Sequence, residues 1–159
     1  KQFEIRPAQV TDCAQILKLI KELALYEKEP DAVETTVKDL EEALFVGSNT
    51  FNNLPACYAV VIDDQEKPGQ LAGFALYMLH FSTWTGKYGI YLEDLYVSEE
   101  ARGNGVATAL IAEVKKMALA QKCSELFWIT KESNHVARKL YDKVAKISDF
   151  VRYEISLDD

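Results

Sequence analysis

The sequence predicts one α/β domain, residues 1–159, in which helices flank a mixed β-sheet. A length of 159 residues is close to the commonest size of one domain and too short for two domains with full cores. Hydrophobic residues make up 48% of the chain and charged residues 27%, which is typical of packed globular proteins. Strand patterns dominate the first part, and strand and helix patterns then alternate, as expected for an α/β fold.

The first third of the chain begins with a short strand and continues with two helices. Phe3–Ile5 alternates in polarity before Arg6-Pro7 ends the pattern. An amphipathic helix follows, with apolar positions at the helical period: Ile16, Leu19, Ile20 and Leu23. Thr36 and Asp39 form a capping pair for a second helix.

The rest of the chain alternates apolar strands with helix patterns. The expected strands are Ala56–Ile62, Leu71–Phe81, Tyr88–Val97, Glu125–Thr130 and Phe150–Leu157. The expected helices are Gly103–Gln121 and Asn134–Val144. A loop is expected over Gly47–Pro55, and the polar residues Asp63–Gly69 predict a hairpin between the first two of these strands.

Cysteines, histidines and hydropathy argue against several classes of protein. Three widely spaced cysteines without a CxxC pair disfavour a disulfide scaffold and favour a reduced, cytoplasmic protein. His80 and His135 have no Cys or acidic neighbour at metal-ligand spacing, so no metal site is predicted. The longest nearly apolar run, Leu71–Leu79, is shorter than a membrane span, and no secretory signal is recognised, so no membrane association is expected.

The charges are distributed unevenly along the chain. A net charge of −7 and a pI of about 4.9 disfavour a nucleic-acid-binding protein. Residues 101–146 nevertheless carry a net charge of +5, so the remainder carries −12. The basic segment can attract an anion while the rest attracts cations. On charge alone, solvated helix faces are the favoured explanation.

A glycine-rich turn between a strand and a helix is the most informative motif. Residues 102–108 read Arg-Gly-Asn-Gly-Val-Ala-Thr, and the free N–H groups of such a turn bind anions. The turn lacks the lysine of a Walker A loop, and Thr108 replaces the third glycine of a dinucleotide-binding motif. Residues 102–107 match in full the acetyl-CoA-binding pattern Gln/Arg-x-x-Gly-x-Gly/Ala. An isolated GxG would more often only turn the chain.

With this loop the sequence resembles the GNAT acetyltransferase superfamily, and within it the diamine (spermidine/spermine-type) and thialysine N-acetyltransferases. Other segments carry the same resemblance in order: Ile5-Arg6-Pro7, Leu19–Ala24 with Tyr26-Glu27, Gly73-Phe74-Ala75, Trp84 with Gly86-Lys87, Tyr91–Asp94, and Asn134 with Tyr141. The resemblance implies a mainly antiparallel central sheet and acetyl-CoA as co-substrate. It also implies direct acetyl transfer to a primary amine of a small diamine, polyamine or thialysine-like substrate.

Two adjacent acids, Glu93 and Asp94, lie in an otherwise apolar strand. Acetyl transfer needs a free amine, whereas an alkylammonium has a pKa of about 10. A carboxylate can bind the cation and accept its proton, directly or through water. Adjacent residues of a regular strand point to opposite faces, so one of the two acids is expected in the cleft. The resemblance implies that Glu93 is the base or amine ligand and that Asp94 is a second substrate contact; a solvated acidic strand end is the alternative.

The departing CoA thiolate must gain a proton, and a tyrosine can supply it. The superfamily places this acid on the helix after the fifth strand, where the sequence has Tyr141. Without the resemblance, an amphipathic core tyrosine would be the default interpretation of Tyr141.

The resemblance also implies two sets of binding residues. The implied CoA contacts are Leu95, Tyr96, Val97, Arg102, Gly103, Asn104, Gly105, Val106, Ala107, Thr108, Asn134, His135, Val136 and Ala137. The implied amine contacts are Tyr26, Glu27, Glu93, Asp94, Phe127, Trp128 and Ile129. A capping or surface role for Tyr26 and Glu27 is nearly as well supported.

The C-terminal part departs from the family pattern. Val144-Ala145-Lys146 replaces a turn that often contains glycine, and Ile147–Arg152 is shorter than in spermine-acetylating members. Only Asp149 offers an acid there, so long polyamines are expected to be poor substrates.

The family further implies a homodimer. Acetylation of a protein lysine and a CoA-binding module without turnover are the competing hypotheses, and the retention of Glu93 and Tyr141 argues against the second.

Overall fold

A computed structural model describes residues 3–47 and 52–158, which separate after Ile129 into two compact units. The larger unit contains the sheet and the first three helices, and the smaller unit contains the fourth. Part of the loop predicted over Gly47–Pro55 lies outside the described residues. The prediction of one domain over residues 1–159 stays a prediction.

A five-stranded sheet forms the centre of the larger unit, and its spatial order follows the chain. The strands are β1 (Phe3–Pro7), β2 (Tyr58–Asp64), β3 (Leu71–Ser82), β4 (Lys87–Val97) and β5 (Glu125–Phe127). β1 to β4 pair antiparallel, and β5 joins β4 in parallel. This confirms the predicted mixed, mainly antiparallel sheet.

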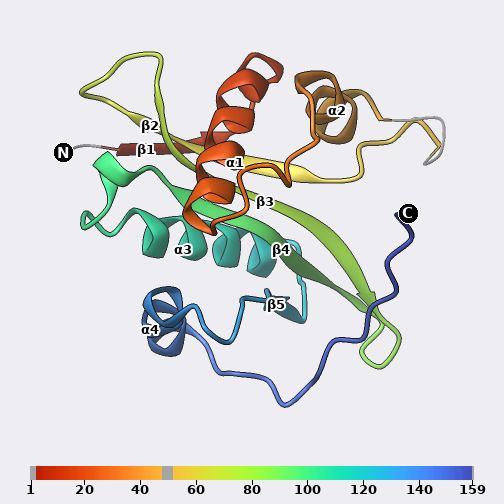
Figure 1. The fold of residues 1–159 in the computed structure, drawn as a ribbon. Helices are drawn as coiled ribbons and strands as arrows, with labels where there is room; N and C mark the ends of the chain where they lie inside the picture. Colours follow the sequence, from red (N-terminus) through yellow and green to blue (C-terminus); the bar gives the residue numbers. More distant parts are fainter. Residues whose placement is uncertain (1–2, 48–51, 159) are drawn as a thin grey trace. The chain divides into compact units, whose positions relative to one another are not determined.

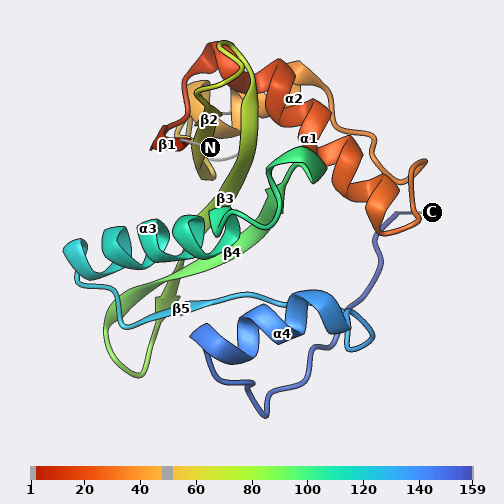
Figure 2. The ribbon, with the colours of Figure 1, turned by 90° about the vertical axis from the view of Figure 1, so that its left-hand side faces the viewer.

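Helices cover both faces of this sheet. The helices are α1 (Cys13–Tyr26), α2 (Val37–Glu41), α3 (Val106–Ala120) and, in the smaller unit, α4 (His135–Val144). α1 and α2 lie on one face and α3 on the other (Figures 1 and 2). None of the helices in residues 3–47 and 52–158 is long and apolar enough to span a bilayer.

Two apolar clusters hold the layers together, and alternation along the strands assigns each side chain to one of them. The α3-side cluster includes Val60, Ile62, Ala75, Ile90, Leu92, Val97, Leu110 and Val114. The α1-side cluster includes Cys13, Ile16, Leu19, Leu40, Val61, Phe74, Leu76 and Tyr96. β4 supplies side chains to both clusters and so packs against the helices on both faces of the sheet.

Local polar contacts define the N-terminal elements. Thr36 accepts a hydrogen bond from the N–H of Asp39 and completes the predicted capping box of α2. Arg6 on β1 binds Asp12 before α1 through Nη1–Oδ2 at 2.8 Å, and Asp63 on β2 through Nε–Oδ2 at 2.7 Å. Against the effect of burial, the guanidinium lowers the pKa of Asp12 and so keeps this junction ionised.

The strand predicted over Phe150–Leu157 is wrong. Residues 145–158 form no helix or strand, and the side chains of Phe150, Tyr153 and Leu157 are about nine-tenths exposed. An alternating pattern becomes a strand only where a neighbouring strand supplies hydrogen bonds and packing. β5 is also shorter than predicted, since it ends at Phe127 instead of Thr130.

Candidate active site

The anion-binding loop, residues 98–105, connects β4 to α3. β4 ends at Val97, a single 3₁₀ turn covers Glu99–Ala101, and α3 begins at Val106. The first N–H groups of α3 have no acceptor within the helix and point toward the loop. Together with the positive end of the helix dipole, they form a site for negative charge. The predicted position of the motif at a helix start is therefore confirmed.

Both glycines of the loop adopt left-handed backbone conformations. Gly103 has φ +80° and Gly105 has φ +72°, where a residue with a Cβ is strained. A Cβ built at either position meets no atom within 4 Å, so open space lies beside both residues. The loop thus leaves room for a ligand to approach its backbone closely.

The loop is braced by its own side chains. The Asn104 amide donates to the carbonyl of Ala101 at 3.0 Å and to that of Arg102 at 3.2 Å. These bonds occupy carbonyl groups and leave the backbone N–H groups for an anion. Asn104, predicted as a CoA contact, therefore also acts in shaping the loop.

β4 has an open edge next to this loop. The parallel pairing of β4 with β5 ends at Tyr91 opposite Phe127, whereas β4 continues to Val97. On its other edge, the end of β4 pairs with β3 through Leu95, Tyr96 and Val97. Backbone groups on the open edge can pair with an extended ligand that enters toward the loop. The three residues predicted to contact the acetyl and pantetheine groups lie along this edge.

A β-bulge in β4 places the two acids. Asp94 pairs with Leu76 and Leu92 pairs with Tyr77, so Glu93 is the extra residue between them. Leu92 and Leu95 both pack in the α3-side cluster, which leaves both acids on the opposite side of the sheet. The expectation that Glu93 and Asp94 point to opposite faces is therefore wrong.

Electrostatic contacts support this arrangement. The Glu93 carboxylate adds to burial in raising the pKa of Cys57, a member of the α1-side cluster. Burial, followed by the charges of Glu93 and Glu27, raises the pKa of Asp94 from 3.8 to about 6. Three carboxyl groups therefore share one region on the α1 side. Such a region stabilises an ammonium group and offers it a proton acceptor.

The predicted amine contacts at the end of β5 and directly after it differ in their surroundings. Phe127 packs on Tyr91 with ring centroids 5.2 Å apart, and on His80 at 5.3 Å. Trp128 instead packs against the α3-side cluster, and Ile129 is half exposed. Phe127 and Tyr91 thus form an apolar wall beside the acids, whereas Trp128 belongs to the core.

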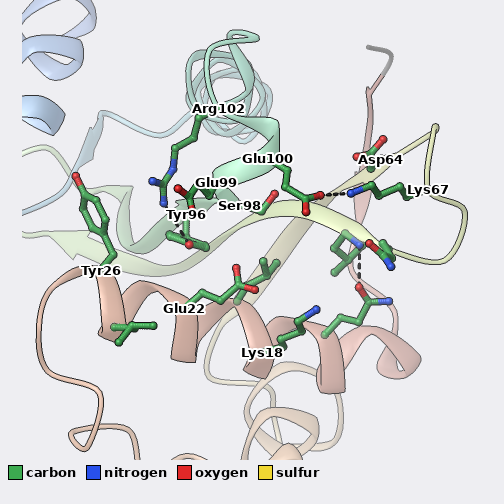
Figure 3. Close-up of a pocket in the computed structure, with 15 residues that line it drawn as sticks. Lys18, Glu22, Tyr26, Asp64, Lys67, Tyr96, Ser98, Glu99, Glu100 and Arg102 are labelled. Atoms are coloured by element: carbon green, nitrogen blue, oxygen red, sulfur yellow. Dashed lines mark hydrogen bonds and ion pairs between the residues drawn. The ribbon is translucent and has the colours of Figure 1, made fainter.

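A cavity of about 600 Å³ lies between α1 and the anion-binding loop. Its lining includes Glu22, Tyr26, Tyr96, Glu100 and Arg102 (Figure 3). Arg102 reaches from the loop toward Tyr26 at the end of α1, and Lys67 pairs with Glu100 at the far side. Sequence reasoning missed Glu22, although its position four residues before Tyr26 places both on one helix face.

The smaller unit carries the remaining predicted residues. Asn134 caps α4 by accepting a hydrogen bond from the N–H of Ala137 at 3.4 Å. His135 and Val136 follow in the first turn, and Val136 is three-quarters exposed. Tyr141 lies half buried in the second half of the same helix. The helix predicted for these residues is confirmed, and their catalytic and binding roles stay predictions.

Comparison with known proteins identifies the family. Residues 17–145 match the model of the acetyltransferase (GNAT) family, and the chain belongs to that family. It is 39% identical over 142 residues to a thialysine N-epsilon-acetyltransferase from Bos taurus, a match that covers 86% of this chain and 79% of that protein. It is 35% identical over 143 residues to a spermidine/spermine N(1)-acetyltransferase-like protein 1 from Homo sapiens, covering 87% of this chain but 20% of that protein.

A solved structure supports the fold. The ribosomal-protein-alanine N-acetyltransferase from Brucella melitensis biovar Abortus 2308 superposes with a TM-score of 0.73 at 24% identity, covering 98% of this chain and 100% of that one. The predicted family, fold class and N-acetyltransferase activity are confirmed.

The raised pKa of Asp94 predicts a pH dependence of stability. The folded state binds the carboxyl proton of Asp94 more tightly than the unfolded chain does. The contribution of this proton to the free energy of unfolding is therefore complete below about pH 4 and is lost as the pH rises through 6. Asp94→Asn should remove this decline and increase the free energy of unfolding at pH 7 by about 1 kcal/mol, a value reduced for solvent screening. Urea unfolding of both proteins between pH 4 and 7 measures the difference.

The exposed Asp31→Asn is the matched control and should follow the wild type. Glu93→Gln should lower the pKa of Asp94, because it removes a neighbouring negative charge. An Asp94→Asn protein with the wild-type pH profile would contradict the assignment.

Proposed function

We propose that this protein transfers an acetyl group from acetyl-CoA to a primary amine of a small diamine, polyamine or thialysine-like substrate. One observation carries the proposal: a single strand, β4, bears a carboxylate pair on one face and ends in an anion-binding loop. The loop suits the diphosphate of CoA, and the carboxylates suit a cationic amine. The names of the two similar acetyltransferases point to the same class of substrate.

The CoA half of the site uses backbone groups. The N–H groups of residues 103–108 bind the pyrophosphate at the start of α3. The open edge of β4 from Leu95 to Val97 binds the pantetheine arm and the thioester, and an N–H of this edge polarises the thioester carbonyl. The family pattern implies that Asn134, His135, Val136 and Ala137 contact the pantetheine arm.

The amine half uses the acidic face at the bulge. Glu93 and Asp94, with Glu27 nearby, attract the ammonium and accept its proton, directly or through water. The neutral nitrogen attacks the thioester carbon and an N–C bond forms. The nitrogen then loses its second proton to water, and the C–S bond breaks. Tyr141 then gives its proton to the departing thiolate and regains one from solvent. No metal or redox group takes part in this reaction scheme.

Substrate length and assembly belong to the same proposal. The short segment Ile147–Arg152 offers a distal ammonium only Asp149, so short diamines and thialysine-like amines should be preferred over long polyamines. The protein acts as one cytoplasmic catalytic domain that forms a homodimer.

An acetyl-CoA-dependent thiol-release assay across a panel of amines tests the activity. The panel contains 1,4-diaminobutane, spermidine, spermine, thialysine and a lysine peptide. We expect the largest kcat/KM with a small amine from the first class, and the smallest with spermine among the polyamines. Turnover of the peptide alone would replace the proposal by protein acetylation, and CoA binding without any turnover would leave a binding module.

Gly105→Ala tests the placement of CoA. The methyl group strains the left-handed backbone and fills open space beside the loop, so the Kd for CoA should rise about tenfold. Gly86→Ala is the matched control, because Gly86 also has a positive φ and open space around it but lies in the β3–β4 turn. Calorimetric titration with CoA should separate the two variants. Equal effects of both substitutions on the Kd would contradict a cofactor site at Gly105.

Tyr141→Phe and Glu93→Gln should fail in different ways. Loss of the Tyr141 hydroxyl should preserve CoA binding and lower kcat by about 10²–10⁴, the usual contribution of one general acid. Glu93→Gln should raise the amine KM as well, and its rate should recover partly at high pH, where more amine is neutral. Steady-state kinetics from pH 7 to 10 measure both effects. Wild-type kcat in both variants, with chemistry limiting, would exclude the assigned roles.

A further inference from the structure

Arg102 lies between two tyrosine rings that come from different elements (Figure 3). Its guanidinium carbon is 4.9 Å from the ring centroid of Tyr26 on α1 and 5.5 Å from that of Tyr96 on β4. Nη2 donates to the Tyr96 hydroxyl at 3.2 Å, and Nε donates to the carbonyl of Val97, also at 3.2 Å. The side chain of the loop arginine is therefore directed toward α1.

The same contacts continue to a second residue of α1. The Tyr96 hydroxyl, which accepts from Arg102, also lies in the electrostatic field of the Glu22 carboxylate, and both residues line the same cavity. Burial, followed by Glu22, raises the pKa of Tyr96 against the opposing charge of Arg102, so the phenol stays protonated and can donate. Glu22 and Tyr26 are four residues apart on one face of α1. One position of α1, Tyr26, thus contacts the loop arginine directly, and a second, Glu22, acts on the Tyr96 phenol that binds it.

This external contact adds to the bonds that Asn104 makes within the loop. Gly103 follows Arg102 directly and Gly105 lies two residues further on, and both give the backbone access to many conformations. When a guanidinium stacks on a partly exposed aromatic ring, it stabilises one of these backbone conformations by about 1 kcal/mol. Tyr26 is half exposed, so its ring contributes mainly through this stack rather than through core packing.

We propose that Tyr26 is a positioning residue that holds the anion-binding loop through Arg102 and thereby couples CoA binding to amine binding. The inference rests on the proposed function. The coupling follows from two neighbouring residues at the end of α1. Tyr26 stacks on Arg102 of the loop, and the Glu27 carboxylate acts electrostatically on Asp94 at the acidic face. A ligand that orders the end of α1 at one site therefore orders it for the other. Because coupling between two sites is reciprocal, CoA and the amine should each tighten the other's binding.

Titration calorimetry with CoA, which is not turned over, tests the positioning role. Tyr26→Leu should raise the Kd for CoA about fivefold, the change that corresponds to about 1 kcal/mol. Tyr26→Phe keeps the ring and should bind CoA within about twofold of the wild type. Tyr153→Leu makes the same change at an exposed tyrosine of the smaller unit and should bind CoA like the wild type.

A double-mutant cycle identifies the partner of Tyr26. Arg102→Lys keeps the positive charge but loses the planar group that stacks on the ring, so it should weaken CoA binding. If Tyr26 acts through Arg102, the double variant should bind CoA no more weakly than Arg102→Lys alone. Fully additive losses would overturn the assignment.

The coupling is measured by repeating the CoA titration with saturating 1,4-diaminobutane. The amine should lower the Kd for CoA in the wild type and in Tyr26→Phe, and leave it unchanged in Tyr26→Leu. An unchanged Kd in Tyr26→Leu without the amine, or equal losses in Tyr26→Leu and Tyr26→Phe, would overturn the inference. Absence of CoA binding by the wild type would instead contradict the proposed function.

Discussion

One extra residue in β4 determines what the rest of the site can do. At Glu93 the strand bulges, so Leu92 and Leu95 both stay in the α3-side core while Glu93 and Asp94 face the other side. In a regular strand, one of the two acids would point into the apolar cluster, where an unpaired carboxylate is costly. The bulge removes this conflict and gathers negative charge on one face. Burial, together with the neighbouring charges of Glu93 and Glu27, raises the pKa of Asp94 on that face.

The same strand joins the two halves of the reaction. Past the last pair with β5, its open edge runs directly from the acidic bulge to the anion-binding loop. An extended thioester bound along this edge would bring its acetyl group near the carboxylates while its diphosphate lies at the start of α3. Strand β3 pairs with the whole of this segment and holds it rigid. Arg102 of the loop also contacts Tyr26 at the end of α1. The helix that ends next to the acidic residues therefore also supports the anion-binding loop.

Features encoded by neighbouring residues could be predicted from the sequence, whereas features that need contacts between distant residues could not. The Thr36 cap, the apolar face of α1 and the helix after residues 102–105 are encoded by neighbouring residues, and each was predicted. The bulge at Glu93 was not predicted. A bulge is an extra residue in one strand relative to its partner, so it can be recognised only when the pairing of β3 with β4 is known. The stack of Tyr26 on Arg102 joins residues far apart in sequence and left no pattern. The predicted strand over Phe150–Leu157 failed for the related reason that alternation does not specify a partner strand.

If the cationic substrate binds on the face created by the bulge, a bound amine must change the pKa of Asp94. Carbon-13 NMR of the aspartate carboxyl groups can follow Asp94 from pH 4 to 8, with assignment by Asp94→Asn. In the presence of CoA and saturating 1,4-diaminobutane, the account predicts that the pKa falls from about 6 toward 4, because a nearby ammonium stabilises the carboxylate. A pKa that stays at about 6 when the amine is bound would place the substrate elsewhere and contradict the account.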